Sequence, residues 1–408
     1  MTLEIKQRIE QIKNGEIPEG YKRTKAGIIP EKWEIKKLSD VLKKQTQKNT
    51  DNEIQNVLTN SATQGIVCQT EYFDKQIANN ENTSGYYIVK PGYFVYNPRI
   101  SVSAPCGPFN RYNGDKDGIM SPLYSVYCFC DKSITYANFL TYYFSSSKWY
   151  AYMNSIANYG ARSDRMNVTR EDMNNMPIPY PPLPEQQKIV AILSEQDKVI
   201  ECYEKKIEQL KRMKKYYLQN MFPKRGETVP KIRFNGFTDP WEQRKVSEIT
   251  SVAPFKQYLS EAKDDGEYEV IQQGDKPILG YANGSPFMEY EKTTLFGDHT
   301  LSLYKTKSPF FVASDGLKIL YSDGMDGYFY YYLLEKYKPE SEGYKRHFTI
   351  LKGSECSFPK LKDEQEKIGK CFNGLDNLIT LHQRKLEEEK KKKKALQQLL
   401  LTGIVRTN

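Results

Sequence analysis

Two long segments of the chain place apolar residues at alternating three- and four-residue spacing, which is the period of an amphipathic helix. In the first segment, from Glu185 to Phe222, these positions are Ile189, Ile192, Val199, Tyr203, Ile207, Leu210, Tyr217 and Met221. In the second, from about Asp363 to Leu401, they are Ile368, Phe372, Leu375, Ile379, Leu386, Leu396 and Leu400. Each stripe contains a slip or two, as in a coiled coil with a stutter. The pattern predicts two long helices.

The residues at the ends of these segments agree with that prediction. Pro184 stands where proline is tolerated, at a helix start, and Glu185 suits the positive end of the helix dipole. Pro223 ends the first helix, and Gly403 stops the second. A helix with one apolar stripe is unstable alone in water, and the nearest partner is the related stripe of the same chain. We therefore expect an antiparallel intramolecular coiled coil.

The stretches that precede each long helix are rich in β-branched and aromatic residues interrupted by Pro, Gly and Asn, which is typical of strands and turns. Examples are residues 84–103, 121–130 and 300–322. Shorter helices are expected at residues 134–156 and 325–337, where apolar residues recur at helical spacing. Each stretch therefore predicts a globular domain that contains both strands and helices.

The frame around each globular stretch is repeated, although the contents are not. Residues 28–41 (IIPEKWEIKKLSDV) are echoed by residues 237–250 (FTDPWEQRKVSEIT), so that Trp33 matches Trp241. The proline-to-helix junction PPLPEQQKIVAIL, residues 181–193, is echoed by FPKLKDEQEKIG, residues 358–369. There the pair Glu185-Gln186 matches the pair Glu364-Gln365. The repeat predicts two similar units in one chain.

Together these patterns predict a mixed α/β (α+β) fold with pseudo-two-fold symmetry, as in a dimer made from one chain. The expected domains are 1–183 for an N-terminal helix and the first globular domain, 184–222 for the first long helix, 223–362 for the second globular domain, and 363–408 for the second long helix and the tail.

Composition favours a cytoplasmic protein with a polyanionic partner. The 408 residues carry a net charge of +9 with a pI near 8.9, and 31 of them are tyrosines, which offer stacking faces. Seven scattered cysteines indicate a reducing compartment. No run approaches the roughly 18–20 apolar residues of a membrane span. The run EEEKKKKK at residues 387–394 is interpreted first as a solvated helix face and second as a lysine patch that contacts DNA or a partner.

Motifs for catalysis are missing from the sequence. It contains no phosphate-binding loop, no Gly-rich cofactor fingerprint and no nucleophile elbow. The three histidines, His299, His347 and His382, lack metal-ligand spacing. We therefore expect no catalytic residue, no metal site and no cofactor in this chain.

The frame segments resemble those of the specificity subunits of type I restriction-modification enzymes. The resemblance rests on residues 14–41, on MNNMPIPYPPLPEQQKIVAIL at residues 173–193 and on KKKALQQLLLTGIVR at residues 392–406. It covers essentially the whole chain, although the second junction has lost its Pro-Pro-x-Pro run.

The resemblance implies that each globular domain is a target-recognition domain that reads one half of a split DNA sequence. The helices would act as a ruler that sets the gap between the halves. Two methyltransferase (M) subunits would dock on the helices and bring S-adenosylmethionine. A restriction (R) motor-nuclease subunit would bring ATP and Mg. Under this interpretation the chain itself is not an enzyme.

Candidate DNA contacts are basic and amide residues in loops, because such side chains match base edges and phosphates. The candidates are Asn97, Arg99, Asn158, Tyr159, Arg162, Ser163 and Arg165 in the first domain, and Tyr344, Lys345, Arg346 and His347 in the second, with His299 and Lys318 as weaker ones. Two alternatives stay open: a coiled-coil protein-interaction scaffold without sequence-specific DNA binding, and an enzyme whose site has no recognisable motif.

Overall fold

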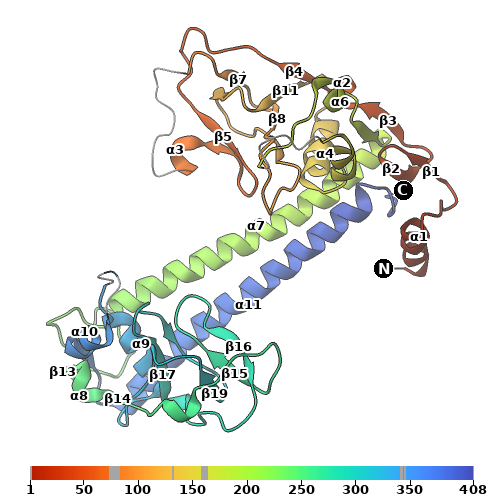
Figure 1. Cartoon of the computed structure of the whole chain (residues 1–408). Helices are drawn as coiled ribbons and strands as arrows, with labels where there is room; N and C mark the ends of the chain where they lie inside the picture. The colour runs from red at the N-terminus through yellow and green to blue at the C-terminus, as the bar shows by residue number, and fades with distance from the viewer. Residues whose placement is uncertain are drawn as a thin grey trace. The chain divides into compact units, whose positions relative to one another are not determined.

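The computed structural model describes residues 2–72, 83–130, 133–157, 164–340, 343 and 346–407 (Figure 1). It divides into two compact units. Unit 1 comprises Met1–Glu201 and Glu387–Asn408, and unit 2 comprises Cys202–Leu386. Each unit thus contains a globular part together with a part of each long helix.

Unit 1 begins with a helix and a hairpin and continues into a strand-rich core. Its elements are α1 (Leu3–Lys13), β1 (Tyr21–Thr24), β2 (Gly27–Pro30), β3 (Glu34–Lys37), α2 (Leu38–Val41), β4 (Leu42–Gln45), β5 (Leu58–Ser61), β6 (Gly65–Cys68), α3 (Gln69–Tyr72), β7 (Tyr87–Val89), β8 (Phe94–Tyr96), β9 (Phe109–Arg111), β10 (Gly118–Met120), β11 (Ser125–Phe129), α4 (Ile134–Ser145), α5 (Tyr150–Ile156), α6 (Arg170–Asn174) and β12 (Pro177–Tyr180). Four strands form the antiparallel sheet β4-β11-β8-β9.

The helix α4 packs on this sheet through a continuous aromatic core. Ser133 caps the helix by accepting a hydrogen bond from the backbone of Tyr136. Phe109 of β9 packs against Phe144 of α4, with ring centroids 4.1 Å apart and the ring planes tilted by 31°. The predicted helical region at residues 134–156 is thereby confirmed as two helices, α4 and α5.

Unit 2 has its own sheets and its own helix layer. Its elements are β13 (Glu242–Lys245), α8 (Val246–Ile249), β14 (Ser251–Val252), η2 (Lys256–Tyr258), β15 (Tyr268–Ile271), β16 (Ile278–Ala282), η3 (Tyr290–Lys292), β17 (Thr293–Gly297), β18 (Leu303–Tyr304), β19 (Phe310–Val312), β20 (Leu317–Tyr321), α9 (Gly327–Tyr337), α10 (Phe348–Gly353) and β21 (Glu355–Phe358). One sheet has the order β14-β20-β17-β18, and a second, β16-β15-β19, contains a parallel pair. The helix predicted at residues 325–337 is confirmed as α9, which Asp326 caps.

The two long helices are confirmed as α7 (Leu183–Asn220) and α11 (Lys362–Leu400). In unit 2, Tyr203 of α7 packs against His382 of α11 with ring centroids 5.8 Å apart, and Lys214 pairs with Asp376 at 2.9 Å. The residue number of the contacting residue in α11 falls as the residue number in α7 rises, so the helices are antiparallel, as expected. In unit 1, Gln196 of α7 likewise donates a hydrogen bond to Glu389 of α11 at 2.6 Å.

One position of the predicted stripe is wrong. Ile192 is 40% exposed, and Leu193 occupies the buried position instead. At this end of α7 the buried residues are spaced by four, from Ile189 to Leu193. The sequence pattern had spaced them by three, from Ile189 to Ile192, so the predicted apolar stripe is displaced by one residue here.

The frame predicted from the repeat recurs in both units. In unit 1, β3 pairs antiparallel with β12, the strand that precedes α7. In unit 2, β13 pairs antiparallel with β21, the strand that precedes α11. A short helix, α2 or α8, follows the first strand of each pair. Each unit therefore closes its globular part with the same two-stranded ladder at the start of a long helix.

Candidate nucleic-acid interface

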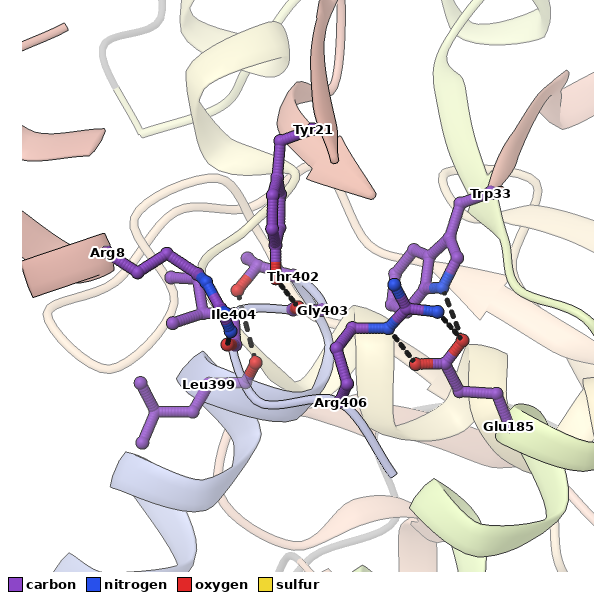
Figure 2. Close-up of polar contacts among 9 residues, drawn as sticks. All are labelled: Arg8, Tyr21, Trp33, Glu185, Leu399, Thr402, Gly403, Ile404 and Arg406. Carbon is purple, nitrogen blue, oxygen red and sulfur yellow. Dashed lines mark hydrogen bonds and ion pairs between the residues drawn. The ribbon is translucent and has the colours of Figure 1, made fainter. Parts of the chain in front are cut away.

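The repeated glutamate at the start of α7 anchors the frame of unit 1. Trp33 donates its indole N–H to Glu185 Oε2 at 2.8 Å, and Arg406 donates to both carboxylate oxygens at 2.7 and 3.0 Å (Figure 2). Hydrogen bonding to Glu185 raises the pKa of the Arg406 guanidinium above its ordinary value. The charge of this buried glutamate is thereby neutralised in place.

The same arrangement recurs in unit 2. Trp241 donates to Glu364 Oε1 at 3.3 Å, and Arg233 forms a bidentate pair with Glu364 at 2.7 and 2.9 Å. Hydrogen bonding to Glu364 raises the pKa of Arg233. The glutamates repeated in the sequence are therefore structural anchors that fix a tryptophan and an arginine against the start of each long helix.

The neighbouring glutamines fix the proline junctions. Gln186 donates to the carbonyl of Pro181 at 2.7 Å, and Gln365 donates to the carbonyl of Pro359 at 2.8 Å. Both glutamines are almost fully buried. The repeated Glu-Gln pair therefore sets the angle at which each globular part meets its helix, because both side chains are held by groups outside the helix.

The tail after α11 also holds the N-terminal segment of unit 1. Arg8 of α1 donates to the carbonyl of Ile404 at 2.6 Å, and Tyr21 donates to the carbonyl of Gly403 at 2.7 Å (Figure 2). Gly403 has φ +67°, and a Cβ there would lie 2.4 Å from the Pro30 side chain. The glycine expected to stop α11 thus makes the turn that brings the tail against the β1–β2 hairpin.

Two of the predicted DNA-contact loops lie side by side in unit 1. Arg99 and Arg165 form an antiparallel bridge, which is flanked by hydrogen bonds from Ile100 N–H to the Asp164 carbonyl and from Met166 N–H to the Pro98 carbonyl. These flanking bonds make Arg99 and Arg165 a non-hydrogen-bonded pair, the closer of the two antiparallel arrangements. Directly opposed residues point to the same face, so the two arginines emerge together.

This juxtaposition is electrostatically costly unless an anion lies close to it. Like charges that are directly opposite in a ladder destabilise it. The carboxylate of Asp164 lies 3.9 Å from Arg99, with both side chains more than half exposed, and such a pair offsets little. A phosphate between the two guanidinium groups would accept hydrogen bonds from both. The arrangement therefore suits a nucleic-acid backbone or a base edge.

Asn97 shapes this loop with both ends of its side chain. Its amide donates to the Asn60 carbonyl at 3.2 Å, and its oxygen accepts from the backbone N–H of Arg99 at 3.0 Å. Gly107 closes the loop at φ +76°, where a Cβ would lie 2.0 Å from the Asn97 carbonyl oxygen. Asn97 therefore positions Arg99, and the direct DNA contact predicted for its side chain stays a prediction.

Six of the predicted contacts fall outside the described residues. They are Asn158, Tyr159, Arg162, Ser163, Tyr344 and Lys345. Of the four candidates in unit 2, the structure describes Arg346, which is exposed, and His347.

His347 is fully buried, so the contact between its ring and DNA predicted from the sequence is wrong for this conformation. Its backbone N–H donates to the Asp298 carbonyl at 2.8 Å, and its ring lies 3.2 Å from the same oxygen. Phe348 N–H donates to the Asp298 carboxylate at 2.8 Å. The histidine thus joins the segment that carries Arg346 to the loop after β17.

That loop meets a third one in unit 2. His299 N–H donates to Gln273 Oε1 at 3.1 Å, and Gly274 N–H donates to Ser302 Oγ at 2.9 Å. Leu301 holds a left-handed backbone at φ 57°, which a leucine rarely adopts. The loops at residues 272–276, 297–302 and 346–348 therefore form one cluster, in which Gln273, which the sequence did not single out, joins the first loop to the second.

The comparisons with known proteins agree with this geometry. Residues 30–212 match the family model of the type I restriction modification DNA specificity domain. This segment of the chain is therefore similar to the DNA specificity domain of type I systems. The putative type I restriction enzyme MjaX specificity subunit of Methanocaldococcus jannaschii is similar to it, with 24% identity over 421 residues that cover 95% of this chain and 97% of the relative.

Solved structures show the specificity-subunit fold. The S subunit of a type I restriction-modification system from M. genitalium aligns with a TM-score of 0.56 and 16% identity, covering 90% of this chain and 96% of that one. A chain solved in work on complex assembly and conformational transition of the type I R-M system aligns with a TM-score of 0.53 and 16% identity over 92% and 99% of the two chains. At this identity the likeness concerns the fold alone.

The described part of the chain contains neither a metal-binding cluster nor a membrane-spanning helix. No group of three or more His, Cys, Asp or Glu side chains there is arranged to hold a metal ion. No helix among the same residues combines the length and the apolar character needed to cross a membrane.

Proposed function

We propose that this chain is a specificity subunit that reads a bipartite DNA sequence without catalysing any reaction itself. Unit 1 reads one half of the target through the surface that carries Arg99 and Arg165, and unit 2 reads the other half through the loop cluster around Gln273 and Arg346. The observation that carries this proposal is the opposed arginine pair, a like-charged ladder position at which Arg99 is exposed and Arg165 is partly exposed.

The long helices act as the ruler between the two halves. A helix of 38 residues is about 57 Å long, which exceeds the roughly 34–36 Å of one turn of B-DNA. Antiparallel pairing stiffens both helices, and a rigid spacer fixes the gap better than a flexible linker, whose ends sample a wide range of separations. The Glu-Gln pair at each junction supports this role, because it holds each globular part rigidly to its helix.

Catalysis belongs to partner subunits in this proposal. Two methyltransferase subunits dock on the helices and bring S-adenosylmethionine, and a restriction subunit brings the motor and nuclease with ATP and Mg. The assembly works in the cytoplasm, where its DNA lies. The match of residues 30–212 to the type I DNA specificity domain and the complex assembly named for a structural neighbour support these partners.

A selection experiment tests the proposal. The complex with the methyltransferase subunit is incubated with a library of random duplexes, and the bound duplexes are sequenced. The wild type is expected to select two short specified halves separated by a constant gap. The double variant R99Q/R165Q is expected to lose the preference in one half and to keep the other.

Arg23→Gln is the matched control, since Arg23 is an exposed arginine of the same unit that lies in β1, outside the loops. The proposal fails if the wild-type complex shows no preference among duplexes. It also fails if R23Q and R99Q/R165Q change the selected sequence to the same extent.

A further inference from the structure

Both units contain the same tyrosine–aspartate–lysine network between a globular helix and the long helices. In unit 1, Tyr142 of α4 donates to Asp197 Oδ2 at 2.8 Å, and Lys393 pairs with the same carboxylate. In unit 2, Tyr332 of α9 donates to Asp376 Oδ2 at 2.7 Å, and Lys214 pairs with it at 2.9 Å. The network ties each globular part to both long helices.

A second contact, present in both units, shows which residues of α4 and α9 occupy equivalent positions. Phe139 lies edge-on to Trp33 at 6.3 Å, and Phe329 lies edge-on to Trp241 at 6.2 Å. Each phenylalanine is three residues before the tyrosine of its network. The three residues after each tyrosine can therefore be compared position by position, and Ser145 of α4 corresponds to Glu335 of α9.

This position is the one at which the two networks differ in charge. Glu335 lies 3.2 Å from Lys214, with both side chains at most a quarter exposed, so Lys214 has two carboxylate partners. In unit 1 the corresponding Ser145 is neutral, and it accepts a hydrogen bond from Gln397 at 2.9 Å. Unit 1 therefore lacks, at this place, the negative charge that unit 2 has.

A hollow of about 640 Å³ lies at this place in unit 1. Lys390, Lys393 and Lys394 line it, and their spacing puts them on one face of α11. Among the described residues that line the hollow, Asp197 is the acidic one, so its lining carries more positive than negative charge. The rest of the polar lining is Ser103, Ser145, Ser146, Ser147, Tyr150, Gln397 and Gln398.

The rim of the hollow continues into the arginine loop. Val102, Ser103 and Pro105 line the hollow, and Val102 is fully exposed. Arg99 lies three residues earlier on the same loop, at most about 10 Å away along the chain. Ammonium groups and hydroxyls are suited to bind a phosphate, with lysine acting as a point charge. A single DNA backbone could therefore contact both the lysines of the hollow and the arginines of the neighbouring loop.

We propose that this hollow binds a phosphate of the DNA backbone next to the half-site that unit 1 reads. This inference rests on the proposed function. The phosphate supplies in unit 1 the negative charge that Glu335 supplies in unit 2. Because a phosphate contact positions the protein and carries no sequence information, the site contributes affinity and register while the loops specify the bases.

The substitution Ser145→Glu tests this by giving unit 1 the carboxylate of unit 2. Ser145 is exposed, so the longer side chain is tolerated, and S145Q is a control of the same shape without the charge. DNA affinity of the complex with the methyltransferase subunit is measured against salt concentration. S145E is expected to reduce the slope of log K against log salt by about 0.9, which corresponds to roughly eight-fold weaker binding at 0.1 M salt. S145Q is expected to bind within about two-fold of the wild type.

A second variant tests the lysines themselves. K390Q/K394Q leaves the Tyr142–Asp197–Lys393 network intact and is expected to reduce the salt slope in the same direction as S145E. In both variants the sequence selected from a random library is expected to stay unchanged, since the bases are read elsewhere.

Equal affinity and slope for S145E and S145Q would overturn the inference. An effect of S145E on assembly with the methyltransferase subunit, without an effect on DNA binding, would also overturn it and assign the hollow to an acidic side chain of that partner. If the wild-type complex selects no sequence, the proposed function fails. If it selects a sequence but S145E behaves as S145Q, this inference alone fails.

Discussion

The ion pair between Arg233 and Glu364 offers a direct test of the anchoring role assigned to the repeated glutamates. We consider the substitution Arg233→Met, which keeps a long unbranched side chain but removes the guanidinium. The Glu364 side chain is 1% exposed and that of Arg233 is 12% exposed. The variant therefore leaves a buried carboxylate with the Trp241 indole N–H, at 3.3 Å, as its remaining donor among the described contacts.

The expected loss follows from the cost of an unpaired buried charge. Removing one partner of a buried ion pair costs about 3–5 kcal/mol, and we expect about 3 kcal/mol because Arg233 retains some contact with water. For a folding unit of 150–250 residues, 1 kcal/mol shifts the melting temperature by about 2–4 °C. Unit 2 of R233M should therefore melt about 6–12 °C below the wild type.

Differential scanning calorimetry measures the shift, and hydrogen exchange localises it to unit 2. The control is Arg212→Met, because Arg212 pairs with Glu208 in an exposed position of α7, where such a pair is worth about 0.5 kcal/mol or less. The double variant R233M/E364Q should recover most of the loss, since a neutral amide still accepts from Trp241. A shift for R233M no larger than that for R212M would refute the reasoning.

Three further predictions concern single side chains of unit 2. Burial lowers the pKa of Lys305 to about 8, against an ordinary value of 10.5. Between these two pH values the unfolded chain holds a proton on this lysine that the folded chain has released, so the free energy of unfolding of the wild type relative to K305M should rise from pH 8 to pH 10.5 by on the order of 3 kcal/mol. A difference in urea denaturation that does not change with pH would contradict this. Tyr332→Phe removes the 2.7 Å hydrogen bond to Asp376 and should lower the free energy of unfolding by about 1–2 kcal/mol in the same assay. The control Tyr281→Phe, at an exposed position, should change it by less than about 0.5 kcal/mol. Equal losses in the two variants would argue against a stabilising role for the Tyr332–Asp376 hydrogen bond. Gln365→Leu leaves the Pro359 carbonyl and the Asp326 N–H without their partner and should cost at least about 2 kcal/mol by thermal denaturation, while Gln383→Leu on the exposed side of α11 serves as the control and should be nearly neutral.

The repeat in the sequence was sufficient to predict the two long helices, their antiparallel pairing and the duplicated frame, since each rests on local periodicity or on matched motifs. The contacts within the frame were not predicted. Trp33 and Glu185 lie 152 residues apart and bond to each other. The available signal was that both partners recur together as Trp241 and Glu364, which indicates a contact retained in each unit.

The candidate interface was predicted less well, because loops carry little periodic signal. Arg99 and Arg165 were chosen separately for their residue type, and their direct opposition depends on a bridge between distant segments. His347 was chosen for the same reason and proved to be buried, because the Asp298 backbone in a remote loop accepts its N–H. Gln273 was missed because its role is set by the loop at residues 297–302, which sequence spacing does not place beside it.

The most direct test of the central claim is a map of methylated bases across the genome of cells that contain the methyltransferase subunit, with and without this chain. We expect one bipartite motif, with two specified halves separated by a gap of constant length, and the loss of all methylation at that motif when the chain is removed. Methylation that persists without the chain, or a motif that is continuous instead of split, would contradict the account.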